Sequence, residues 1–411
     1  MGKQRFWLGW LVAIAVFASG LAWTPPALAF TQDQKVFLQA WRIVNQAYVD
    51  DSFNGQNWWF MRQRYLRRPF RDRDDAYEAI EEMLATLGDP YTRLLRPEEY
   101  RSLQVSTSGE LTGIGVQINL EPKTLQLQVI SPIAGSPAER AGVRAGDRIL
   151  EIDGVSTQSL SLDEAAMKMR GEVGTRVQLT LQRDSEPAEE IVEIFRDRIA
   201  LNPVSANLDT SGAVPIGYLR LSQFNANATA ELTEAIADLE AQGASAYILD
   251  LRNNPGGLLQ AGIGVARLWL DDAPIVYTVN RRGMLGSFEA NGSAIADAPL
   301  VVLVNRGSAS ASEILAGALQ DNHRAQLLGE QTFGKGLIQS LFELPDDSGL
   351  AVTVAKYETP NHHDINKLGI TPDKIVTQEP ISVTEIGSDL DLQYQAAIRL
   401  LEETSTLVRP A

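Results

Sequence analysis

Residues 300–319, LVVLVNRGSASASEILAGAL, decide the fold of the larger part of the chain. The apolar run Leu300–Val304 predicts a buried strand. Ser310, followed three residues later by Glu313, forms a capping box that predicts a helix start, and Ile314–Leu319 supplies the apolar residues of that helix. Because a buried strand followed by a helix is typical of an α/β layer, this stretch predicts helices packed around a sheet.

The same stretch contains a candidate nucleophile. The chain has only three His and no Cys, so Ser-His and Cys-His catalytic pairings have little to work with. A serine can still attack a carbonyl if a neutral lysine accepts its proton, and Lys335 follows in Gly334-Lys-Gly336. Residue types alone do not choose among Ser308, Ser310 and Ser312. Each partner also has a structural interpretation, the serine as a helix cap and the lysine as a turn residue.

A lysine that acts as a base must be neutral near pH 7, whereas its reference pKa is about 10.4. Burial among apolar groups disfavours the ammonium form. Phe333, Leu337 and Ile338 are the apolar neighbours in sequence that could provide this environment. The catalytic interpretation therefore depends on how deeply Lys335 is buried.

Two further patterns are similar to a nucleotide-binding loop and to a metal site, but each lacks a residue that such a site needs. The spacing Gly329-x4-Gly334-Lys335 is similar to the start of a phosphate-binding P-loop, but Gly336 supplies no hydroxyl for a metal ion, which argues against nucleotide binding. His362 and His363 are adjacent, yet a metal site would need a third ligand in register, so they predict a polar loop. We expect neither a metal nor a cofactor.

The start of the chain has the pattern of a signal peptide. Lys3 and Arg5 precede an apolar run from Phe6 to Leu21, and Ala27-Leu-Ala29 is a small-x-small cleavage site. We expect residues 1–29 to be removed after Ala29, leaving an exported and soluble protein; the alternative is an uncleaved membrane anchor. The 411 residues suggest two or three domains, and a net charge of −16 argues against nucleic acid as a partner.

Residues 30–104 are predicted to be helical. Thr31-x-x-Gln34 is a capping box, and a second helix is expected near Asp74–Leu87. Between these helices lie Trp58, Trp59 and Phe60, whose rings we expect to form the core of a small helical subdomain, rather than a ligand cage.

Residues 105–185 resemble a PDZ domain. The features that carry the resemblance are Gly113-Ile-Gly-Val116, the helix start Ser136-Pro-Ala-Glu139 and the run Gly142–Ile149. Asp153-Gly154 predicts a hairpin turn within it. The resemblance implies that the backbone N–H groups of Gly113, Ile114, Gly115 and Val116 bind the C-terminal carboxylate of a peptide, which adds as a strand to the sheet edge.

Residues 186–380 alternate predicted strands and helices, as expected for an α/β core. Strands are predicted at Ile216–Leu221 and Ala246–Asp250, with a helix at Ala230–Gln242 between them. Residues 381–411 form a C-terminal segment with one helix expected near Leu390–Leu401. The fold class is therefore α+β or mixed multidomain.

Two motifs of this core resemble those of the carboxyl-terminal processing peptidases, which are tail-specific serine proteases with an inserted PDZ domain. They are Asn305–Leu319 and Gly329–Gln339. The resemblance implies that the α/β core is a Ser-Lys protease with Ser310 as nucleophile and Lys335 as general base. It further implies that Gln339 orients the lysine, and that the backbone N–H groups of Gly256 and Ala311 bind the oxyanion.

Two further segments are similar to the members of this family in oxygenic phototrophs, which process the photosystem II D1 precursor. In Glu358–Ile365 the common bacterial form has glycine where this chain has His362, and Phe53–Trp59 points the same way. The resemblance implies a soluble serine endopeptidase of the thylakoid lumen or periplasm that acts on protein substrates with free C-terminal tails, here the membrane-embedded D1 precursor. The alternatives are a general tail-specific protease and a non-catalytic PDZ binding module or chaperone.

Overall fold

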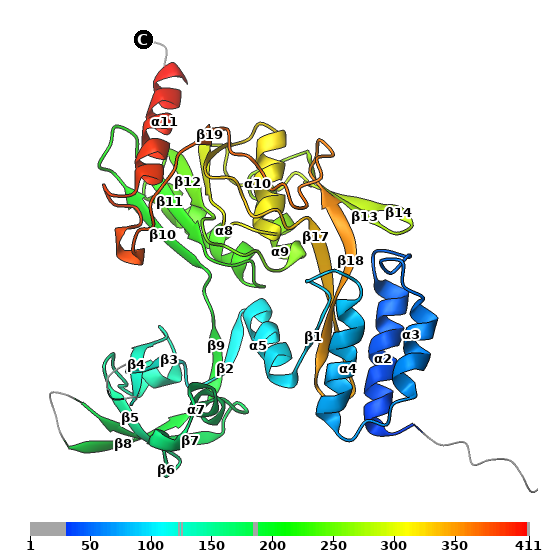
Figure 1. Ribbon diagram of the computed structural model, residues 1–411. Helices are drawn as coiled ribbons and strands as arrows, with labels where there is room; N and C mark the ends of the chain where they lie inside the picture. Colours follow the sequence, from blue (N-terminus) through cyan, green and yellow to red (C-terminus); the bar gives the residue numbers. More distant parts are fainter. Residues whose placement is uncertain (1–29, 122–123, 125, 184–187, 409–411) are drawn as a thin grey trace, which may run out of the picture. The chain divides into compact units, whose positions relative to one another are not determined.

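The computed structural model describes residues 30–408 apart from 122–123, 125 and 184–187 (Figure 1). The predicted signal peptide, residues 1–29, lies outside the described residues. The described chain forms two compact units, one of residues 30–48, 52–94 and 341–352, the other of residues 49–51, 95–340 and 353–408. Within these residues, no helix combines the length and the apolar character that crossing a bilayer requires.

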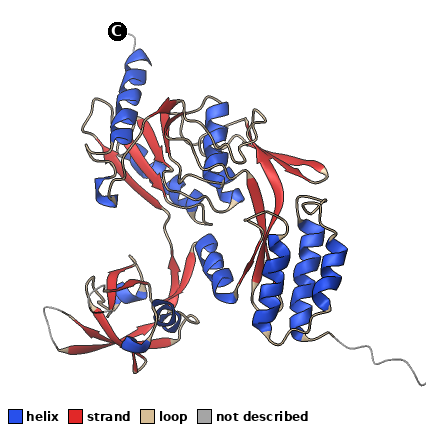
Figure 2. Ribbon diagram, in the orientation of Figure 1, coloured by secondary structure: helices blue, strands red, loops and turns tan. Residues whose placement is uncertain are grey.

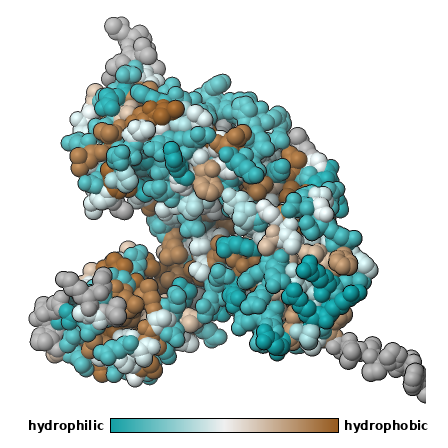
Figure 3. Space-filling view, viewed as in Figure 1, coloured by the Kyte–Doolittle hydropathy of each residue, from teal (hydrophilic) through white to brown (hydrophobic). Residues whose placement is uncertain are grey.

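The first unit contains three helices, α2 (Gln32–Ala47), α3 (Trp58–Leu66) and α4 (Arg73–Ala85). The capping box of α2 is confirmed, because the N–H of Gln34 donates to Thr31 Oγ1 at 3.2 Å and the N–H of Thr31 donates to Gln34 Oε1 at 3.0 Å. Side chains buried between the helices include Val36, Phe37, Ala40, Ile80 and Met83. The outer surface of this unit is largely hydrophilic in Figure 3.

The prediction that three adjacent rings pack this subdomain is right for one ring and wrong for two. Trp58 is 3% exposed, and its indole N–H donates to the carbonyl of Trp41. Trp59 and Phe60 are 57% and 52% exposed. The physical reason is helical geometry: residues 58, 59 and 60 are successive on α3 and point about 100° apart, so they cannot share one buried face.

A helix and a short ribbon follow in the second unit: α5 (Pro97–Ser108), and β2 (Glu110–Gly113) paired with β9 (Asp197–Ala200). The chain between β2 and β9 forms a separate sheet, ordered β3-β4-β5-β7-β8, with β6 paired to β5. Its elements are β3 (Val116–Leu120), β4 (Leu127–Pro132), α6 (Pro137–Arg140), β5 (Arg148–Ile152), β6 (Val155–Ser156), η1 (Thr157–Ser159), α7 (Leu162–Met169), β7 (Arg176–Gln182) and β8 (Glu189–Phe195). The predicted hairpin is confirmed, since Asp153 and Gly154 connect β5 to β6 with φ of 50° and 73°.

The second six-stranded sheet is ordered β10-β11-β12-β15-β16-β19, and its strands are among those drawn in red in Figure 2. Only the β10–β11 pair is antiparallel. Its strands and helices are β10 (Val204–Asp209), β11 (Ile216–Leu221), α8 (Ala228–Ala241), β12 (Ala246–Asp250), α9 (Leu259–Arg267), β15 (Leu300–Val304), α10 (Ala311–Asp321), β16 (Gln326–Gly329), β19 (Lys374–Ile375), η2 (Val383–Glu385) and α11 (Leu392–Val408). A further sheet is ordered β1-β18-β13-β14, with β17 paired to β18. It contains β1 (Arg93–Leu95), β13 (Pro274–Asn280), β14 (Gly283–Glu289), β17 (Leu337–Glu343) and β18 (Gly349–Glu358).

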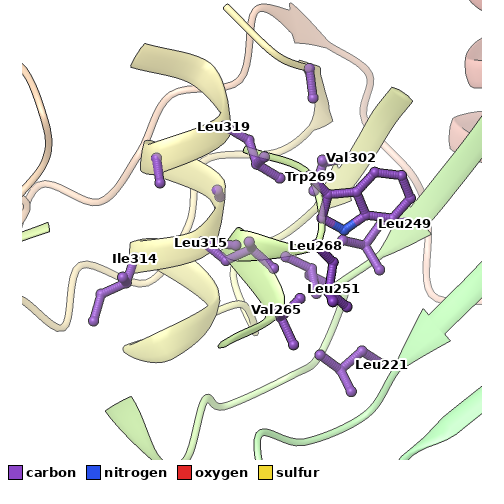
Figure 4. Close-up of a cluster of buried hydrophobic side chains, with 14 of the residues drawn as sticks. Leu221, Leu249, Leu251, Val265, Leu268, Trp269, Val302, Ile314, Leu315 and Leu319 are labelled. Carbon is purple, nitrogen blue, oxygen red and sulfur yellow. The ribbon is translucent and has the colours of Figure 1, made fainter. Parts of the chain in front are cut away.

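Helices cover both faces of the six-stranded sheet, which explains why its central strands are continuously apolar. Alternate residues of each strand face opposite layers: Leu249 and Val302 pack with α8, α9 and α10, whereas Ile248 and Val301 pack with α11. Figure 4 shows Leu315 of α10 within the first of these clusters. The predicted α/β layer around a sheet is confirmed, and α10 is buried from Ala311 to Leu319 against one face of that sheet.

Candidate active site

Ser310 occupies the turn between β15 and α10, as the residue that caps the helix. Its φ of 56° and ψ of −115° lie in a region that non-glycine residues rarely adopt. A strained serine between a strand and a helix is the arrangement of a nucleophile elbow, which presents the hydroxyl at the end of a sheet. The backbone at Ser310 thus has the form that nucleophile presentation requires.

The structure distinguishes the three serines that residue type could not. Ser308 and Ser312 are fully buried, and their hydroxyls donate to the carbonyl oxygens of Leu251 and Asn254 at 2.8 and 2.9 Å. Ser310 is partly exposed, and its side chain makes no capping hydrogen bond. Two of the hydroxyls therefore hold the loop together, and the third remains available for chemistry.

The carboxylate of Glu313 joins the backbones of the predicted nucleophile and base. Glu313 is fully buried, and its Oε2 accepts from the N–H groups of Ser310 at 2.9 Å and Lys335 at 2.8 Å. Its Oε1 accepts from the N–H of Gly334 and from Thr332 Oγ1, each at 2.6 Å. Four donors satisfy the buried charge, and because two of the bonds end on one oxygen atom, Ser310 and Lys335 are adjacent.

Tyr357 of β18 contacts the same two residues from their carbonyl side. Its hydroxyl lies within hydrogen-bond distance of the carbonyl oxygens of Ser310, at 3.1 Å, and Lys335. Ser310 and Lys335, the predicted nucleophile and base, are thus held by a carboxylate at their N–H groups and by a phenol at their carbonyls. The sequence predicts neither contact, because Tyr357 belongs to no recognisable motif and the capping box already accounts for Glu313.

The two glycines around Lys335 allow a close approach of two backbones. A Cβ on Gly334, whose φ is 90°, would lie 2.9 Å from the backbone nitrogen of Gly369, and a Cβ on Gly336 would lie 2.6 Å from that of Asn366. Only glycine fits such contacts. The two glycines therefore allow the loop that carries Lys335 to pack closely against residues 366–369. Lys335 itself is half-buried.

The two predicted oxyanion donors lie beside Ser310. Gly256 has a φ of 95°, and a Cβ there would lie 2.8 Å from the Cβ of Ser310 and 2.9 Å from the nitrogen of Ala311. The N–H of Ala311 is one of the first-turn donors that an α-helix leaves without an intrahelical partner. The N–H of Gly256 donates to Asn254 Oδ1 at 2.9 Å, so this donor is engaged by its own loop.

The remaining predicted site residues lie on other elements. Gln339 is on β17, and its amide donates to Thr353 Oγ1 at 3.4 Å. The segment 113–116 runs from the end of β2, which belongs to the β2–β9 ribbon, to the start of β3 in the small sheet. Within it, Ile114 is buried and the carbonyl of Gly115 accepts from Ser136 Oγ, and Gly113 and Val116 are the flanking strand residues. The roles of Gln339 and of this loop stay predictions.

His362 has a φ of 60°, a left-handed conformation that glycine adopts more readily than other residues. Its ring stacks on Tyr277 with centroids 4.3 Å apart, and Nδ1 lies 2.9 Å from Glu358 Oε2. Among the described residues, no group of three or more His, Cys, Asp or Glu is arranged to hold a metal ion.

A buried charge network anchors the strand end from which the Gly256 loop starts. The guanidinium of Arg252 donates to Asp250 Oδ2 at 2.6 Å and makes two bonds of 2.8 Å to Asp391 at the start of α11. Tyr218 also donates to Asp250, and its pKa is raised by burial and by the charge of that carboxylate. The C-terminal helix is therefore tied to the segment that carries Gly256, which the sequence did not predict.

We expect the replacement Asp391→Asn to destabilise the protein by about 3 kcal/mol at neutral pH, because it breaks a buried ion pair. Burial alone would raise the pKa of Asp391, but the hydrogen bonds and charge of Arg252 hold it below its usual range. A lowered pKa contributes stability that is present above the unfolded value of about 3.9 and is lost as pH falls through the folded value. In urea unfolding, the difference in the free energy of unfolding between wild type and Asp391→Asn should therefore become smaller below about pH 4.

The exposed neighbour Asp389 provides the control, since Asp389→Asn should leave stability within about 0.5 kcal/mol at every pH. If the difference in the free energy of unfolding between wild type and Asp391→Asn stayed the same from neutral to acidic pH, the assigned ion pair would be contradicted.

Comparisons with known proteins show the family to which the chain belongs. Residues 215–376 match Peptidase family S41, and residues 128–183 match a PDZ domain. A carboxyl-terminal-processing protease of Picosynechococcus sp. is 61% identical over 383 residues, which cover 93% of this chain and 92% of the relative. The chloroplastic C-terminal processing peptidase of Tetradesmus obliquus is 42% identical over 389 residues, covering 91% and 84%. A solved photosystem II D1 C-terminal processing protease is 41% identical with a TM-score of 0.57, covering 88% of this chain and 99% of that structure.

Proposed function

Because the chain belongs to Peptidase family S41 and to its carboxyl-terminal-processing proteases, we propose that it hydrolyses peptide bonds near the C-termini of proteins with a Ser310–Lys335 dyad. One observation carries the proposal. A single buried carboxylate oxygen accepts from the N–H groups of both residues, while Ser310 is the one partly exposed hydroxyl of the three serines in the loop. The alternative of a non-catalytic binding module gives no reason for such an arrangement.

In the proposed reaction, Ser310 Oγ attacks the scissile carbonyl carbon as neutral Lys335 accepts its proton. The tetrahedral intermediate places its oxyanion between the N–H groups of Gly256 and Ala311, where a helix N-terminus also favours negative charge. For Gly256 to donate, its hydrogen bond to Asn254 must be shared or released. Lys335 then protonates the leaving amine, and water hydrolyses the acyl-enzyme. Gln339 is the residue proposed to orient the lysine.

The PDZ domain is proposed to select the substrate by its free end. Residues 113–116 would bind the terminal carboxylate through backbone N–H groups, and the peptide would add as a strand beside β3. Support comes from the sheet order, in which β3 is an edge strand with one side open for pairing.

The proposed substrate is the photosystem II D1 precursor, and the proposed location is the thylakoid lumen, reached through the leader at residues 1–29. The solved relative at 41% identity acts on D1, and chloroplastic processing peptidases are among the similar proteins. A general tail-specific protease of the periplasm or lumen is the second candidate, because nothing in the dyad itself selects one tail.

The test is to incubate the protein with a peptide of the D1 C-terminal extension and with an unrelated protein that ends in an apolar tail. We expect a kcat/KM at least about tenfold higher for the D1 peptide, which corresponds to about 1.4 kcal/mol of selectivity. Equal cleavage of both would favour the general protease. Failure to cleave either would favour the binding module, especially if the peptide still binds.

A further inference from the structure

A groove with a volume of about 520 Å³ runs along the three-helix unit, on the side where α2 and α3 meet. Its lining combines cations with apolar side chains: Lys35, Arg42 and Arg62 with Phe30, Leu38 and Trp41. We call these six residues the cationic groove. A lining of this kind suits a ligand that presents anionic groups beside hydrocarbon.

The three cations of the groove have no carboxylate partner among the described residues. Arg42 donates to the neutral amide of Gln39 at 3.2 Å, and the guanidinium carbon of Arg62 lies 5.4 Å from the ring centroid of Trp41. The Nε of Arg62 is buried without a hydrogen-bond partner, although buried donors are usually paired. These charges are therefore available to an anion.

Arginines of the same unit that do have carboxylate partners lie outside the groove. Arg71 contacts Asp75 at 2.5 Å, and Arg73 contacts Asp33 at 2.7 Å and also pairs with Asp346. The chain as a whole has a net charge of −16. Unpaired cations gathered at one groove of an acidic protein indicate a surface kept for anions.

Two exposed aromatic rings lie on α3, the helix that supplies Arg62 to the groove. Trp59 lies three residues before Arg62, so these two side chains share a face of the helix, whereas Phe60 lies two residues before Arg62 and projects from a different face. An exposed Trp beside Arg is typical of helices that lie in the interface of a bilayer, where the ring inserts among headgroups.

We propose that the cationic groove, with Trp59, binds the surface of an anionic lipid bilayer. Lys35, Arg42 and Arg62 contact the phosphate or other anionic headgroups, and the indole of Trp59 enters the headgroup layer. This binding is independent of the peptidase reaction, because none of these residues belongs to the dyad, its supporting side chains or the proposed peptide-binding loop.

The test is flotation of the purified protein with vesicles of phosphatidylcholine alone and of phosphatidylcholine mixed with phosphatidylglycerol. We expect tighter binding to the mixed vesicles than to vesicles of phosphatidylcholine alone. The exposed cations are replaced in Lys35→Gln and Arg42→Gln, each lowering the affinity about fivefold and both together about 25-fold. Added salt should weaken binding further, since the Debye length shortens from about 10 Å at 0.1 M to about 3 Å at 1 M.

Arg93→Gln is the matched control, because Arg93 is an exposed cation of the same unit that does not line the groove. A Trp59→Ala variant should also lose affinity for the mixed vesicles, whereas Phe60→Ala, which removes an exposed ring from another face of α3, should not, and the far-UV circular dichroism of both should be unchanged. Wild type and variants carry the same N-terminal residues, so any contribution of residues 1–29 cancels. Equal affinities of wild type and the double Lys35→Gln/Arg42→Gln variant would overturn the proposal, as would binding to an acidic peptide but not to either vesicle.

Discussion

The variant Ser310→Ala is expected to lose cleavage of a C-terminal peptide almost completely, with kcat lowered about 10⁶-fold, as for the loss of other serine nucleophiles. The residual rate would come from the oxyanion donors and from substrate binding. Single-turnover measurements with a D1 C-terminal peptide are suited to such a slow reaction. Labelling by a fluorophosphonate should disappear in parallel, because the reagent needs the same hydroxyl.

The neighbouring serines supply matched controls for this experiment. Ser308→Ala and Ser312→Ala each remove a buried hydroxyl that donates to a backbone carbonyl, so each should reduce stability by about 1–2 kcal/mol. Both variants should still be labelled at Ser310 when folded. Labelling that persists in Ser310→Ala and vanishes in either control would assign the nucleophile to another serine.

The variant Lys335→Arg is expected to lower kcat by at least about 10⁴-fold, which is the upper range for loss of a general base. Arginine keeps the positive charge and similar length, but its guanidinium stays protonated and cannot accept the proton of Ser310. Steady-state kinetics with the same peptide would show the fall in kcat, while KM should change little because the lysine is not proposed to bind the tail.

Lys367→Arg is the control, because Lys367 is an exposed lysine of the loop that packs against Gly334. It should retain full activity. Full activity in Lys335→Arg as well would remove the lysine from the mechanism, whereas inactivity with retained peptide binding would support it.

Much of the fold could be predicted from local sequence, because its signals depend on neighbouring residues. The capping box at Thr31 and the turn at Asp153-Gly154 use contacts within a few positions, and the apolar strands follow from a sheet covered on both faces. The prediction that Trp59 is buried is wrong, because it places three adjacent rings in one core, whereas successive residues of a helix point in different directions.

The candidate site was predictable in its residue types and not in its connections. Ser310 and Lys335 belong to recognisable motifs, but no local pattern indicates that Glu313 accepts from both N–H groups. The Arg252–Asp391 pair joins residues 139 positions apart, and neither belongs to a motif. Such contacts depend on how distant elements meet, and one sequence carries no periodic signal for that.

The shared carboxylate of Glu313 also bears on how the enzyme matures. If the lysine loop were not yet in place, Glu313 would be a buried anion lacking the donors of Thr332, Gly334 and Lys335. An underpaired buried charge costs several kcal/mol, so states with one loop closed and the other open are poorly populated. We therefore expect the proposed nucleophile and base to be brought together in one cooperative step, so that a partly folded chain would lack the proposed dyad and would not attack unfolded neighbours.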